Sequence, residues 1–97
     1  MSSLLRQGTI VTSEAELVQS VIAWVRDKQR SGSLRDGEVL PDTDLVATGL
    51  LDSLGLIELV AFLEAQTGCT IDLTDVDPSE FSVVRGLCRI TLRSSQA

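Results

Sequence analysis

Apolar residues recur at helical spacing behind residues 1–12, which show no clear period themselves. Ser13 and Glu16 have the spacing of a capping box, in which a serine starts a helix and a glutamate reaches back to it. Basic side chains fill the last turn before Ser31, which suits the negative end of a helix dipole. The pattern therefore predicts a first helix that ends near Arg30. Its apolar positions are Leu17, Val18, Val21, Ile22, Trp24 and Val25.

A second helical pattern runs from about Leu54 to Gln66. Asp52 or Ser53 can cap this helix by accepting from its free backbone N–H groups, and Gly68 suits the left-handed residue at which helices often end. The helix carries two apolar sets. One suits the core, and the other either adds to the core or forms an exposed patch, flanked by acid, for a partner. The first set is Leu56, Leu59, Val60, Phe62 and Leu63, and the second is Leu54, Ile57 and Ala61, beside Glu58.

Turn chemistry rather than a regular period marks residues 34–52, but several apolar side chains there predict an ordered crossover loop. Pro78 suits the first position of a short helix near residues 77–80, and Ser82 is predicted to cap a last helix over about residues 83–92. The last helix should turn Val84, Leu87, Cys88 and Thr91 inward and Arg85, Arg89 and Arg93 outward.

Three longer helices, one short third helix and a long loop between the first two helices predict an all-α fold, a small four-helix bundle. The length of 97 residues is enough for one domain. We expect the folded domain at residues 13–93, with a flexible N-terminal tail at 1–12 and a flexible C-terminal tail at 94–97.

The charge is unevenly distributed along the chain. It has 8 basic and 14 acidic residues, a net charge of −6, and eleven of the acids but no base lie between Asp36 and Val84. This balance makes nucleic acid and anionic membrane surfaces poor partners. The acidic half either serves solubility alone or also steers basic partners toward the domain. Because no leader-like or membrane-spanning apolar segment is present, we expect a cytoplasmic protein that does not enter a membrane.

Histidine is absent, which removes the Ser–His and Cys–His nucleophile systems, histidine metal ligands and the commonest general base. We therefore expect no enzyme activity. Cys69 and Cys88 have neither a CxxC nor a metal-ligand spacing and are expected to be reduced thiols, and a thiol enzyme would need an activating base that the sequence does not show. A calcium-binding loop over residues 72–80 would lack the central glycine of an EF-hand.

Ser53 is the main candidate for chemistry. It stands at the start of the second helix, where the positive end of the dipole would stabilise a phosphate added to the hydroxyl. The alternative is that Ser53 only caps the helix.

The run from Leu45 to Leu59 resembles the modification motif of acyl and peptidyl carrier proteins. That motif is an Asp-Ser-Leu triplet after a glycine-containing loop, followed by an apolar helix with an early glutamate. Here the triplet is Asp52-Ser53-Leu54, and the glutamate is Glu58. The resemblance extends to the first helix, the exit of the second and the short third helix, and it covers roughly residues 13–93. Such triplets arise by chance, but the flanks in register make this match specific.

The resemblance implies a discrete, stand-alone carrier protein that acts as a monomer. A phosphopantetheinyl transferase would use coenzyme A to attach a 4′-phosphopantetheine arm to Ser53, with Asp52 assisting, and the arm would hold an acyl or aminoacyl group as a thioester. The other implied partners are adenylation or acyl-ligase enzymes, acyltransferases, and synthase or condensation enzymes. The docking face of the family falls on Leu54, Ile57, Glu58 and Ala61.

The sequence departs from the fatty-acid-synthesis type of carrier. Gly55 follows the triplet where that type usually has an acid, and the second helix holds only two acids, Glu58 and Glu64. The sequence is more similar to the discrete carriers of polyketide or nonribosomal-peptide pathways, which make natural products such as antibiotics. The alternatives are a housekeeping carrier of fatty-acid synthesis and, in a different class, an acidic protein-interaction module without the arm.

Overall fold

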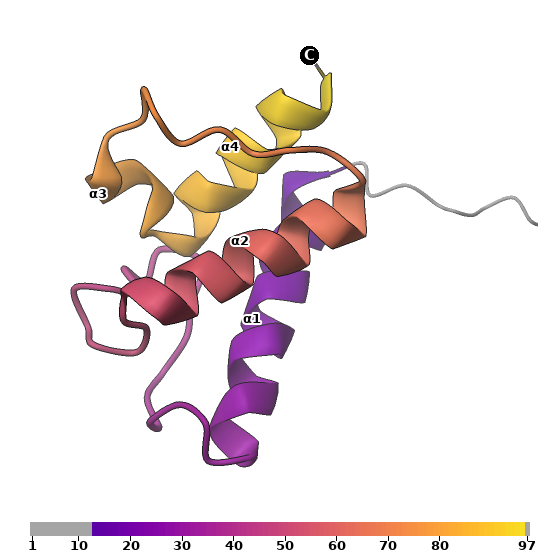
Figure 1. Ribbon diagram of the computed structural model, residues 1–97. Coiled ribbons are helices and arrows are strands. Elements are labelled where there is room, and N and C mark those ends of the chain that lie inside the picture. The colour runs from indigo at the N-terminus through magenta and orange to yellow at the C-terminus, as the bar shows by residue number, and fades with distance from the viewer. Residues whose placement is uncertain (1–12, 97) are drawn as a thin grey trace, which may run out of the picture.

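The computed structural model describes residues 13–96, so the predicted tail at 1–12 lies outside the described residues. Over this range the chain forms four helices and no strand: α1 (Glu14–Arg30), α2 (Ser53–Thr67), α3 (Pro78–Phe81) and α4 (Val84–Gln96). In Figure 1, α2 crosses α1, and a long loop connects them at the lower left. α4 packs against each of the other three helices. The protein is an all-α, small four-helix bundle, as predicted.

α1 begins and ends where the sequence pattern indicated. The Ser13 hydroxyl accepts from the backbone N–H of Glu16 at 3.1 Å and donates to its carboxylate at 3.2 Å, which confirms the cap. Trp24 is only half-buried, at the edge of the core, where its ring packs against that of Phe62 from α2 with 6.1 Å between centroids. The remaining five apolar residues predicted for this helix are buried: Leu17, Val18, Val21, Ile22 and Val25.

The loop between α1 and α2 is ordered, as predicted, because hydrogen bonds hold both its first and its later part. The side-chain amide of Gln29 donates to the carbonyls of Arg35 and Gly37, each at 3.0 Å. Further along, the backbone N–H of Leu45 donates to the carbonyl of Ser82 at 2.8 Å. The loop also buries four apolar side chains in the core: Val39, Leu45, Leu50 and Leu51.

The predicted role of Ser82 is wrong. Ser82 ends α3, where its N–H donates to the carbonyl of Pro78, and α4 begins only at Val84. The reason is tertiary: Val83 pairs with Asp44 of the loop in an isolated antiparallel bridge, so the backbone stays extended there before the helix starts. α4 then continues to Gln96, beyond the predicted end at residue 92.

α4 presents the two faces that the sequence indicated. Its inward set, Val84, Leu87, Cys88 and Thr91, is fully buried. The buried Thr91 hydroxyl is satisfied because it donates to the Leu87 carbonyl at 2.8 Å. On the outer face Arg89 and Arg85 reach Glu14 at the start of α1, at 3.0 and 3.8 Å. These partly exposed ion pairs add little stability each.

Candidate functional site

The chain enters α2 through a tightly held turn. Gly49 has a φ of 79°, a conformation that glycine adopts at no steric cost, and Leu50 and Leu51 follow it into the core. The Asp52 carboxylate then accepts from the N–H of Gly55 at 2.7 Å and caps the helix. Of the two candidate caps, the structure thus assigns this role to Asp52.

Ser53 is the first residue of α2, and its side chain is exposed. The dipole of the helix, and the first-turn N–H groups that the Asp52 cap leaves free, favour an anion at this end. No histidine occurs in the chain to activate the hydroxyl. The arrangement therefore suits a serine that another protein modifies, and an added phosphate would be stabilised there.

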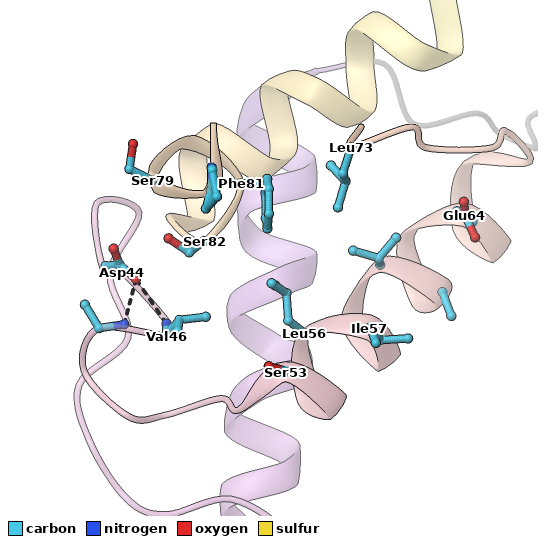
Figure 2. A pocket seen from close by; sticks show the side chains of 14 residues that line it. Asp44, Val46, Ser53, Leu56, Ile57, Glu64, Leu73, Ser79, Phe81 and Ser82 are labelled. Carbon is cyan, nitrogen blue, oxygen red and sulfur yellow. Dashed lines mark hydrogen bonds between the residues drawn. The ribbon is translucent and has the colours of Figure 1, made fainter. Parts of the chain in front are cut away.

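A groove of about 680 Å³ opens beside Ser53. Figure 2 shows α2 as one wall, with the segment around Leu73 and the α3 region opposite, and Leu56 and Phe81 projecting into the space between. The groove is mostly apolar, so it can accept a flexible organic chain that starts at Ser53. Its apolar lining consists of Val46, Ala47, Leu56, Ile57, Val60, Ala61, Leu73, Pro78 and Phe81.

The predicted docking residues all lie on the surface, which decides between the two interpretations of the second apolar set. Leu54 and Ile57 are each 64% exposed, and Glu58 and Ala61 are exposed as well. The structure also places the four docking residues in two groups. Ile57 and Ala61 line the groove together with Ser53, whereas Leu54 and Glu58 face a second hollow of about 390 Å³, which Arg35 also lines.

Several residues around Ser53 were not singled out from the sequence. Val46, from the loop, is 42% exposed, and Phe81 and Leu73 come from the other side of the groove. In the sequence these three residues look like ordinary core residues, because only contacts between distant segments place them at the groove. Glu64 carried a local signal that could have found it, since it follows Ser53 by three helical turns and so shares its face.

Asp72 and Asp77, in the segment before α3, accept local hydrogen bonds. Hydrogen bonds from Thr74 lower the pKa of Asp72, and hydrogen bonds from Ser79 lower that of Asp77. Among residues 13–96, no group of three or more His, Cys, Asp or Glu side chains could hold a metal ion. In the same range, no helix is long and apolar enough to cross a bilayer.

Two comparisons with known proteins find similar sequences. A family described as "phosphopantetheine attachment site" matches residues 33–90, more than half of the chain, from the loop before α2 into α4. A D-alanyl carrier protein of Bacillus velezensis is 38% identical over 42 residues, which are 43% of this chain and 54% of that protein. The match thus spans about half the length of this relative. No solved structure matches the chain.

Proposed function

The chain belongs to the phosphopantetheine attachment family, and we propose on that premise that Ser53 is the residue that carries the 4′-phosphopantetheine arm. Domains of this family are carriers rather than enzymes. When bound, the arm supplies a thiol that holds an acyl or aminoacyl group as a thioester. The observation that carries the proposal is the exposed Ser53 hydroxyl at the start of α2, next to the capping Asp52, within the matched residues.

The residues of this chain hold and present the attachment point. The N–H groups of the first turn of α2 stabilise the phosphodiester charge. The Asp52 carboxylate is oriented by the N–H of Gly55 and assists the transferase that modifies its neighbour. The apolar groove beside Ser53 gives the arm a surface to lie against.

We propose further that the cargo belongs to polyketide or nonribosomal-peptide biosynthesis. Gly55 in place of an acid, and an α2 whose only acids are Glu58 and Glu64, support this rather than the housekeeping fatty-acid carrier. The name of the Bacillus velezensis relative, a D-alanyl carrier protein, favours an aminoacyl cargo as a second candidate. The proposal places the protein in the cytoplasm, as a monomer.

Partner enzymes dock, in this proposal, on Leu54, Ile57, Glu58 and Ala61. Two large apolar side chains that are 64% exposed give a partner surface to bury, and Glu58 beside them favours a basic group on the partner. The partners are the phosphopantetheinyl transferase, the ligase or acyltransferase that loads the arm, and the synthase or condensation enzyme that unloads it.

Intact-mass measurement tests the attachment residue. We expect the protein to gain the mass of one phosphopantetheinyl group when it is incubated with coenzyme A and a broad-specificity transferase. Ser53→Ala should gain nothing, whereas Ser79→Ala, which removes another exposed serine beside the groove, should still gain one group. A wild-type protein that stays unmodified, or a Ser53→Ala variant that is modified, would refute the proposal.

Charge reversal tests the docking face. Glu58→Arg should lower kcat/KM for arm transfer by about tenfold at low salt, and by less at high salt, because it repels a basic partner. Glu38→Arg makes the same change at an exposed position of the loop between α1 and α2 and should have little effect. Equal rates for the two variants, with circular dichroism showing that both are folded, would contradict the assigned face.

A further inference from the structure

Ser53 and Glu64 lie at opposite ends of one face of α2. They are eleven residues apart, which is three helical turns, or about 16 Å at 1.5 Å per residue. Both line the groove, and Figure 2 shows Ser53 at the start of the helix and Glu64 three turns beyond it, with Ile57 between them.

The groove between these ends is mostly apolar, and among residues 13–96 the charged side chains that line it are the acids Asp44 and Glu64. Asp44, at the end nearer Ser53, already uses its Oδ1 atom to accept from the N–H groups of Val46 and Ala47, at 3.1 and 2.8 Å. Glu64, at the far end, accepts from the N–H of Ile71 through Oε2 at 2.8 Å. Within residues 13–96, the Oε1 atom of Glu64 has no hydrogen bond or ion pair.

The length of the arm matches the length of this face. From the serine oxygen to its terminal sulfur, the arm runs over about fourteen covalent bonds, or about 17 Å at the ~1.2 Å per bond of an extended chain. A cargo at the end of an arm that follows α2 would therefore come level with Glu64. The charge of the cargo then matters, because a carboxylate favours an ammonium group and is destabilised when an alkyl group displaces its water.

We propose that the groove selects an aminoacyl cargo and that Glu64 pairs with its amino group. This inference rests on the proposed attachment of the arm to Ser53. Ile57, Val60 and Phe81 hold the apolar part of the arm, and Oε1 of Glu64 accepts from the ammonium group at the far end. Glu64 acts as a specificity-determining residue, and the hydrogen bond from Ile71 orients its carboxylate.

The experiment compares two arms that differ only in the amine. Amide analogues of coenzyme A that carry alanine or propionate, and that cannot hydrolyse as thioesters do, are attached with a broad-specificity transferase. Intact mass first shows that one group has been added. No addition would overturn the proposed function and this inference with it, whereas the steps that follow test the inference alone.

Nuclear magnetic resonance then reports on Glu64. In the alanyl form we expect the amide signal of Ile71 to shift relative to the propionyl form, because its acceptor has gained a partner. In the wild type, the pKa of the alanyl amine should be about 0.5 unit higher than in the free coenzyme A analogue, since a nearby carboxylate favours the charged form. Glu64→Gln keeps an acceptor for Ile71 and should abolish that rise.

Glu38→Gln is the matched control, because it removes one carboxylate from an exposed position of the loop between α1 and α2 that belongs neither to the groove nor to the docking face. It should leave the raised pKa of the amine intact. The inference is overturned if the two arms give the same Ile71 signal, or if Glu64→Gln and Glu38→Gln change the amine pKa equally.

Discussion

Gly86, the third residue of α4, lies against the backbone of α3, and its replacement by alanine tests how α3 is held at the groove. A Cβ atom built on Gly86 would lie 2.0 Å from the carbonyl oxygen of Glu80, where real Cβ contacts are essentially never closer than 3.0 Å. The obstacle is backbone rather than a flexible side chain. The backbones of α3 and α4 must therefore move apart by about 1.0 Å, the difference between those distances, and we expect Phe81 in the groove wall to shift with α3.

The net change in stability follows from two opposing effects. Alanine is favoured over glycine inside a helix by about 1 kcal/mol. Overpacking against a rigid neighbour costs about 1–3 kcal/mol. We therefore expect Gly86→Ala to destabilise the protein by about 1 kcal/mol, which lowers Tm by about 4–8 °C in a domain of this size.

Gly55→Ala provides the matched control, because Gly55 is likewise the third residue of its helix. Its Cβ would meet only side-chain atoms of Leu51 and Asp52, at 3.2 and 3.3 Å, which can yield by a few tenths of an ångström. Thermal unfolding followed by circular dichroism gives the two Tm values, and amide spectra show whether residues 78–82 move. If Gly86→Ala is as stable as Gly55→Ala and leaves those amide signals in place, the packing argument is wrong.

The remaining predictions concern the core and the thiols. Leu59 is fully buried, so Leu59→Ala should lower the free energy of unfolding, measured with denaturant, by about 2–5 kcal/mol. Ile57→Ala on the exposed face should change it by less than ~0.5 kcal/mol. Similar losses for the two variants would contradict the assigned faces. Burial, aided by the charge of Glu14, raises the pKa of the Cys88 thiol to about 12, so a thiol reagent at pH 8 should modify Cys88 only after unfolding. Since that pKa lies above the ordinary 9.0, stability should fall as the pH rises from 9 toward 12, and Cys88→Ala should lose this dependence.

Local chemistry in the sequence was enough to predict the four helices, although not the residue at which α4 begins. The Ser13 cap, the Gly68 exit and Pro78 at the start of α3 act on backbone groups a few residues away, so their effect can be read without the fold. The helix-start position of Ser53 was predicted in the same way, from the residues immediately around it. Trp24 shows the limit of periodicity, because its helical spacing suggested burial although the ring lies half-buried against Phe62.

Tertiary contacts decided the rest. Ser82 had the sequence of a cap, but the pairing of Val83 with Asp44 delayed α4 and turned Ser82 into the end of α3. The exposure of Leu54 and Ile57 was also open in the sequence, because periodicity tells which residues share a face but not whether another segment covers it. The groove is lined by the loop before α2, by α2 and by the α3 region, which are distant in the sequence, and the hydrogen bond from Leu45 to Ser82 joins the loop to the α3 region. The sequence thus determined the elements and the exposed hydroxyl, and long-range packing determined the surface around it.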